Sequence, residues 1–175
     1  MAKTKTSEKL DIRMNEHLKT ELKEIDELVR SEHYASALER VEELTQQYPN
    51  EPSIWRTRAY INSRQGNTEA AIEDVSKAIE MCKLEPDYYF TRGRLFFKVA
   101  RYREAVSDFT EVLKLCDLHN SDYYRESAYF RRADAYARLK QYDEARADCE
   151  HVGDGFRTWT DSLRTKECIL SECGG

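Results

Sequence analysis

One short motif recurs along the chain at nearly constant spacing. Four segments, ASALERVEEL, AAIEDVSKAI, EAVSDFTEVL and EARADCEHV, align on one anchor alanine each: Ala37, Ala71, Ala105 and Ala145. The first two steps are 34 residues (37 to 71 and 71 to 105), and the third is 40 (105 to 145). An apolar or small residue follows every anchor at four and seven positions, which is one face of a helix. A fixed period of this length predicts an array of repeated supersecondary units.

A second stripe of residues precedes each anchor by sixteen, twelve and nine positions. Its members are Trp55, Ala59 and Asn62; Tyr89, Gly93 and Phe96; and Tyr129, Ala133 and Tyr136. The spacing is again that of one helical face, with a small residue in the middle where another helix can approach closely. The first unit is degenerate, with Glu21, Ile25 and Leu28, as terminal repeats often are. Short breakers such as RQGN, residues 64–67, separate the stripes, so each unit is predicted to be a helical hairpin.

Composition agrees with an all-helical chain. Of the 175 residues, 35% are charged and only six are glycine and three proline, which favours helices over strands. The predicted fold is all-α, with about four hairpins across residues 13–153 and a capping helix and tail at 154–175. The expected boundaries are a polar tail at 1–12 and repeats at 18–51, 52–85, 86–125 and 126–153.

Two segments depart from the regular period. The third step contains six additional residues within LCDLHNSDYYRES, which predicts a longer loop or an extended helix with Tyr123 and Tyr124 exposed. After the fourth unit, GDG at 153–155 should end a helix. The apolar residues beyond it define one helical face: Phe156, Trp159, Leu163 and Leu170, with Ile169 and Cys173 at its margin. This face predicts a cap over the end of the array, although Trp159 could instead anchor a partner.

The chain resembles the tetratricopeptide repeat family. That family's unit has a large aromatic, a small residue, an aromatic, an alanine and then an aromatic or aliphatic residue, often with a closing proline. The matching residues are the four anchor alanines, Trp55, Gly93, Phe96, Phe109, Tyr136 and Pro49. The resemblance covers about residues 18–153 and implies a right-handed α-solenoid that binds other proteins without catalysing a reaction.

Charged residues also recur at two fixed offsets from the anchors. One charged residue lies thirteen positions before each anchor and another lies three positions after it. The resulting pairs are Glu24 with Arg40, Arg58 with Asp74, Arg92 with Asp108, and Arg132 with Asp148. We expect each pair to meet across the two helices of its hairpin, with the signs exchanged in the first unit. The alternative is a set of solvated charges in a highly charged chain. A partly buried pair would be mainly structural.

Several classes of function lack their usual sequence signals. The N-terminal segment has no apolar run, and no window reaches the ~18 apolar residues that span a bilayer. The five cysteines have no CxxC spacing, which favours reduced thiols in the cytoplasm over a disulfide framework or zinc site. The four histidines form no HExxH motif, and no nucleophile, phosphate-binding or dinucleotide motif occurs. We therefore expect no catalytic residues, metal, cofactor or small-molecule substrate.

The resemblance implies that the first helices of the hairpins line a concave groove. The candidate groove residues are Arg56, Tyr60, Arg64, Phe90, Arg94, Phe97, Lys98, Phe130, Asp134 and Arg138. One groove offset is basic in every unit (Arg30, Arg64, Lys98 and Arg138), which indicates either a basic rail or cations that meet helix C-termini. The family's lysine and asparagine clamp for chaperone carboxylates is absent, because its positions hold Leu22, Asp26 and Tyr60.

These features predict a binding protein whose partner offers an acidic and apolar segment or domain. Aromatic and arginine side chains on one surface are typical of protein-binding hot spots. By analogy we favour an inhibitor or immunity protein that neutralises a toxin or effector over an adaptor or secretion chaperone. Single-stranded RNA binding through the basic rail and the aromatics is a further alternative. It is disfavoured by the net charge of −5 and the pI near 5.5.

Overall fold

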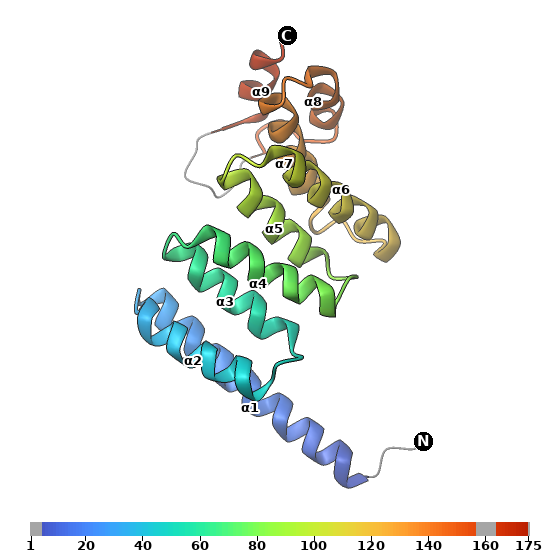
Figure 1. Cartoon of the computed structure of the whole chain (residues 1–175). Coiled ribbons are helices and arrows are strands. Elements are labelled where there is room, and N and C mark those ends of the chain that lie inside the picture. Colours follow the sequence, from blue (N-terminus) through green and yellow to red (C-terminus); the bar gives the residue numbers. More distant parts are fainter. Residues whose placement is uncertain (1–4, 157–163, 175) are drawn as a thin grey trace.

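The computed structural model describes residues 5–156 and 164–174, and every regular element within them is a helix. Four hairpins follow one another in the chain, and a short helix comes last (Figure 1). The helices are α1 (Lys5–Arg30), α2 (Tyr34–Gln47), α3 (Pro52–Arg64), α4 (Thr68–Met81), α5 (Pro86–Lys98), α6 (Tyr102–His119), α7 (Arg125–Arg138), α8 (Tyr142–Cys149) and α9 (Lys166–Glu172). The predicted all-α solenoid is confirmed.

The turn inside each hairpin has the same backbone geometry. One residue per turn adopts a positive φ, at Glu32, Gly66, Ala100 and Lys140, always five positions before the anchor alanine. The next amide donates to a carbonyl five residues earlier, as Arg101 does to Phe96 over 2.9 Å. This pattern ends a helix with a left-handed residue. Although only one of the four is glycine, the turn is kept in every unit.

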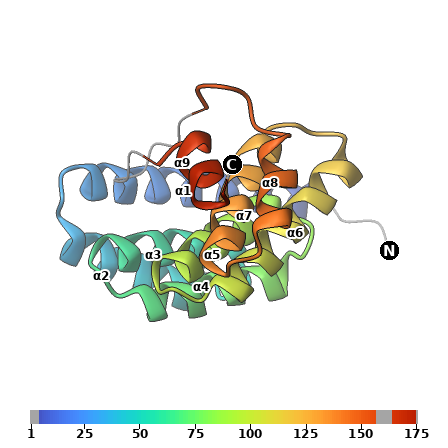
Figure 2. The ribbon, with the colours of Figure 1, turned by 90° about the horizontal axis from the view of Figure 1, so that it is seen from above.

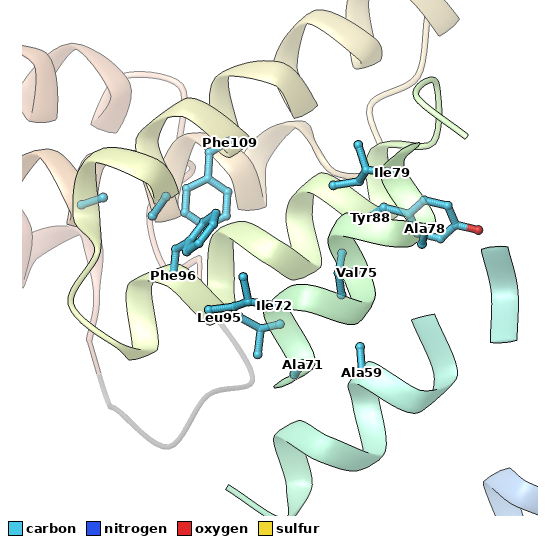
Figure 3. Close-up of a cluster of buried hydrophobic side chains, with 12 residues drawn as sticks. Ala59, Ala71, Ile72, Val75, Ala78, Ile79, Tyr88, Leu95, Phe96 and Phe109 are labelled. Carbon is cyan, nitrogen blue, oxygen red and sulfur yellow. The ribbon is translucent and has the colours of Figure 1, made fainter. Parts of the chain in front are cut away.

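The core lies between the hairpins, which stack in chain order with α9 against α7 and α8 (Figures 1 and 2). The four anchor alanines are all fully buried. In the largest cluster, Phe96 of α5 lies beside Phe109 of α6, and the apolar face of α4 packs nearby (Figure 3). A Cβ atom at Gly93 would lie 2.9 Å from the Phe109 ring, so only glycine leaves room for that ring.

Three segments differ from the expected boundaries. Helix α1 begins at Lys5, inside the segment expected to be a polar tail. The six additional residues of the third step extend α6 to His119 and form the loop after it. In the C-terminal segment, the described helix is only α9, whose Ile169 is fully buried where we expected a marginal position. Trp159 and Leu163 lie outside the described residues.

Candidate functional site

The charged residues at the repeated offsets meet inside every inner hairpin, meaning α3/α4, α5/α6 and α7/α8. Arg92 donates from Nε and Nη2 to the two carboxylate oxygens of Asp108, over 2.9 and 2.7 Å. The same bidentate geometry joins Arg58 to Asp74 and Arg132 to Asp148. The aspartates are buried, and hydrogen bonding to Asp108 raises the pKa of Arg92. These pairs hold the two helices of a hairpin together.

The first hairpin, α1/α2, carries the exchanged pair at its surface. Arg40 bonds Glu24 over 2.9 Å and also Glu21 over 2.6 Å. Both expected partners remain substantially exposed, with 39% of the Arg40 side chain and 51% of the Glu24 side chain accessible. The same two repeat positions therefore meet in every hairpin, but the first hairpin has neither the bidentate geometry nor the burial of the inner pairs.

Two hydroxyl groups extend the inner pairs into the preceding repeat. Arg92 donates to Oγ of Ser76 on α4 over 3.2 Å, and Arg132 donates to Oγ1 of Thr110 on α6 over 3.0 Å. Both hydroxyls stand five positions after an anchor alanine. Each arginine thus binds its own hairpin and the one before it. Our sequence reasoning missed these residues, although their constant offset was a usable signal.

The candidate groove residues divide into three groups by exposure. We call the surface formed by the side chains of α3, α5 and α7 the first-helix surface. Its exposed residues are Arg56, Tyr60, Arg64, Arg94, Lys98 and Arg138, while Phe90 and Phe97 are half-buried. Phe130 is fully buried beside Phe156, and Asp134 is 3% exposed. The last two therefore contribute to packing and charge below the surface instead of lining it.

Phe90 is covered by a tyrosine from the extended third step. The Tyr124 ring lies 5.1 Å from the Phe90 ring, centroid to centroid, and its hydroxyl donates to Asp87 over 2.7 Å. Asp87 also accepts from Nε of Arg56 over 2.8 Å, which links α3 to α5. Burial and the bond to Asp87 raise the pKa of Tyr124. Tyr123 is 82% exposed as expected, whereas its neighbour Tyr124 joins this network.

The four cations of the expected basic rail all contact groups of their own chain. Lys98 donates from Nζ to the carbonyl of Ser63 near the end of α3, over 3.3 Å, and Arg64 donates to the Tyr34 hydroxyl. Arg30 pairs with Asp26 one turn earlier in α1, and Arg138 lies 3.6 Å from Asp134. The Lys98 contact supports the second of the two explanations for the basic offset, in which the cations meet helix C-termini. Its ammonium binds a carbonyl near the end of a helix.

Arg164, two residues before α9, contacts a carboxylate of α7. Arg164 places Nε 2.5 Å from Oδ1 of Asp134 and donates from both Nη atoms to Glu172. Burial raises the pKa of the Asp134 carboxyl, against the opposing influence of Arg164 and Arg138. The C-terminal segment therefore holds α7 and α9 together through a partly buried charge cluster.

Neither a membrane span nor a metal-binding group is found in the part of the chain that the structure describes. None of its helices combines the length and the low charge that crossing a bilayer requires. No three of its histidine, cysteine, aspartate and glutamate side chains are grouped as metal ligands would be.

Solved structures of repeat proteins resemble this fold at low sequence identity. MamA from Desulfovibrio magneticus RS-1 superposes with a TM-score of 0.67 at 15% identity, over 76% of this chain and 72% of that one. A tetratricopeptide repeat protein from Parabacteroides merdae gives 0.72 at 17% identity, over 89% of this chain and 59% of that one. The TPR2B domain of yeast Sti1, solved as a complex with pHsp70, gives 0.61 at 17% identity, over 66% and 96%.

The stacked hairpins and their repeated charge pairs define a helical-repeat solenoid. Two family models described as tetratricopeptide repeats match residues 23–89 and 90–151, which together are most of the chain. The chain belongs to the tetratricopeptide repeat family, whose members are protein–protein interaction modules and generally noncatalytic scaffolds. No curated protein sequence matches it.

Proposed function

We propose that this chain is a noncatalytic cytoplasmic binding protein that holds an acidic and apolar segment of one protein partner on its first-helix surface. The observation that carries the proposal is the combination of aromatic rings and cations on α3 and α5. Tyr60 is 46% exposed and Phe97 is half-buried. Arg94 is exposed and makes no ion pair or hydrogen bond with any described residue. An aromatic ring beside a free guanidinium is typical of binding hot spots.

The charge on this surface supports an acidic ligand. Among the described residues, Arg64, Arg94 and Lys98 have no carboxylate partner, although the protein as a whole has a net charge of −5. Positive potential at a local surface steers an acidic segment toward it and discriminates against basic ones. The role of an inhibitor that neutralises a toxin or effector follows by analogy, because one compact surface suits one dedicated ligand. The alternatives are an adaptor and a secretion chaperone.

The test is capture of partners from the native cytosol by three forms of the full chain. The first is the wild type, and the second carries Arg64→Glu, Arg94→Glu and Lys98→Glu. The third is a charge-matched control with Lys83→Glu, Arg103→Glu and Lys140→Glu, at exposed cations outside the first-helix surface. We expect one stoichiometric partner with the wild type and the control, and loss of it with the second form.

Two results would contradict the proposal. Retention of the same partner by the groove variant would place binding elsewhere on the molecule. Recovery of many unrelated proteins at low stoichiometry would exclude a dedicated partner. The activity of the purified partner with and without this chain then separates an inhibitor, which abolishes that activity, from an adaptor, which leaves it intact.

A further inference from the structure

The corner between α6 and α7 exposes two large apolar side chains. Helix α6 has 18 residues, against 14 in α2 and in α4, because it contains part of the lengthened third step. Leu118 in its last turn is 66% exposed, and Tyr123 in the following loop is 82% exposed. They are the two most exposed large hydrophobic side chains in the described part of the chain. Insertions in a repeat array often form loops on a binding face.

One guanidinium ties the end of α6 to the loop after it. Arg125 of α7 donates from Nη1 to Asp117 over 2.6 Å and from Nε to Asp122 over 2.7 Å. Leu118 and Tyr123 each directly follow one of these aspartates. The two exposed apolar residues are therefore held at one place, and we call residues 117–125 the α6–α7 corner.

Tyr123 is the exposed end of a row of four aromatic rings. Its ring lies 4.8 Å from that of Tyr124, which lies 5.1 Å from that of Phe90, centroid to centroid. Phe90 in turn lies 5.8 Å from Phe109, which is fully buried in the core. The bond from the Tyr124 hydroxyl to Asp87 fixes the second ring of the row. A ring that its neighbours have already oriented loses little conformational freedom when a partner binds.

The charge of the α6–α7 corner is negative. Its two carboxylates, Asp117 and Asp122, share the single guanidinium of Arg125, and their side chains remain 71% and 90% exposed. The C-terminus of α6 adds the negative end of a helix dipole. Carboxylates beside an exposed aromatic ring attract a cation through their charge and through the ring quadrupole. The chain itself uses such contacts, since Cζ of Arg101 lies 4.5 Å from the ring centroid of Phe96.

We propose that the α6–α7 corner is a second docking surface, which binds a lysine or arginine flanked by apolar side chains on a protein partner. The cation lies over the face of Tyr123 beside Asp122, and an apolar neighbour covers Leu118. The two carboxylates repel a phosphate backbone, so a protein segment suits the corner better than a nucleic acid. The inference does not rest on the proposed function, because the first-helix surface takes an acidic segment and this corner takes a basic one.

The test uses peptides of defined chemistry and the full chain. The probes are acetyl-Leu-Arg-Leu-amide, a counterpart with citrulline in place of arginine, and a counterpart with glutamate. Citrulline keeps the size of the arginine side chain and removes its charge. NMR signals of the Tyr123 ring and of the backbone amides of 117–125 report on the site. We expect the arginine peptide to shift these signals and to bind about threefold to tenfold more tightly than either counterpart.

Two substitutions locate the contact within the corner. Tyr123→Ala removes the exposed ring, and Asp122→Asn removes one carboxylate and keeps the ring. Each should weaken binding of the arginine peptide by about threefold to tenfold. The matched control is Tyr142→Ala, at a tyrosine that is 36% exposed and begins α8. This control should leave the binding unchanged.

Three results would overturn the inference. Equal binding of the arginine and citrulline peptides, or no binding of either, would show that the corner does not recognise a cation. Equal weakening by Tyr123→Ala and Tyr142→Ala would show that the peptide has no preference for the corner. If the Tyr123 signals shifted with protein concentration in the absence of peptide, the occupant would be a second copy of this chain.

The triple groove variant separates this inference from the proposed function. With Arg64→Glu, Arg94→Glu and Lys98→Glu, the chain should lose the partner of the first-helix surface and keep the response of Tyr123 to the arginine peptide. Loss of the Tyr123 response in that variant would place the peptide on the first-helix surface and overturn the second docking surface. Failure of the capture experiment, with the Tyr123 response intact, would overturn the proposed function alone.

Discussion

The first and third hairpins place a charged pair at the same repeat positions but in different surroundings. In α1/α2 the pair is Glu24 with Arg40, and both side chains are more than a third exposed. In α5/α6 it is Arg92 with Asp108, whose side chains are 21% and 5% exposed. The repeat period determines which positions face each other, whereas packing from neighbouring hairpins determines how strongly the pair contributes.

The small-residue position differs between the same two hairpins. The third hairpin has Gly93 opposite Phe109, and the first has Ile25 opposite Val41 at the corresponding offsets. All but the glycine are fully buried apolar residues, and the glycine itself is buried. The third hairpin combines the smallest residue on one helix with a large ring on the other, whereas the first hairpin places two aliphatic side chains of intermediate size at these positions. The ring of Phe109 requires the absence of a side chain at position 93.

The largest effect is expected from breaking the third pair. Asp108→Leu leaves the guanidinium of Arg92 without its carboxylate, and we expect a loss of about 3 to 5 kcal/mol in the free energy of unfolding. Chemical denaturation monitored by circular dichroism measures it. The double variant Asp108→Leu with Arg92→Met removes both charges and should recover most of the loss. If the double variant were as unstable as the single one, the stranded charge would not be the cause.

The first hairpin supplies the matched control for that experiment. Arg40→Met removes the cation of the exposed pair with Glu24, together with its bond to Glu21, whose side chain is 21% exposed. We expect a loss of at most about 1 kcal/mol in the free energy of unfolding, because exposed pairs contribute little. A loss as large as that of Asp108→Leu would show that burial is not what distinguishes the two hairpins.

A smaller effect is expected from filling the glycine position. The Cβ atom of Gly93→Ala would lie 2.9 Å from Cε1 and 3.1 Å from Cζ of Phe109, so the ring must move. We expect a loss of about 1 to 3 kcal/mol from overpacking. The double variant Gly93→Ala with Phe109→Val reproduces the Ala59 and Val75 combination of the second hairpin. The double variant should lose less unfolding free energy than the sum of the two single losses. Strict additivity of the losses would contradict the proposed clash.

The period predicted the fold and the charge pairs because both depend on offsets within one unit. The spacing of Arg92 and Asp108 is visible in the sequence, and the hairpin brings them together. Contacts made by the irregular segments were harder to predict. The bond from Tyr124 to Asp87 depends on the course of the extended third step, which has no counterpart in the other repeats. Phe130 was expected at the surface, yet Phe156 from the C-terminal segment packs beside its ring.

A last small effect concerns the turns, where the two hairpins agree instead of differing. Ala100 adopts a φ of 59° and Glu32 a φ of 61°, a region that side chains with a Cβ atom disfavour by ~1 to 2 kcal/mol. Glycine removes that strain but loses more chain entropy on folding. We therefore expect Ala100→Gly and Glu32→Gly each to stabilise the protein by about 0.5 to 1 kcal/mol. The control is Ala70→Gly, an exposed helical position in α4, which should destabilise by a similar amount. If all three variants lost stability, the positive φ at the turns would not be a source of strain. The glycine at position 66 would then need another explanation.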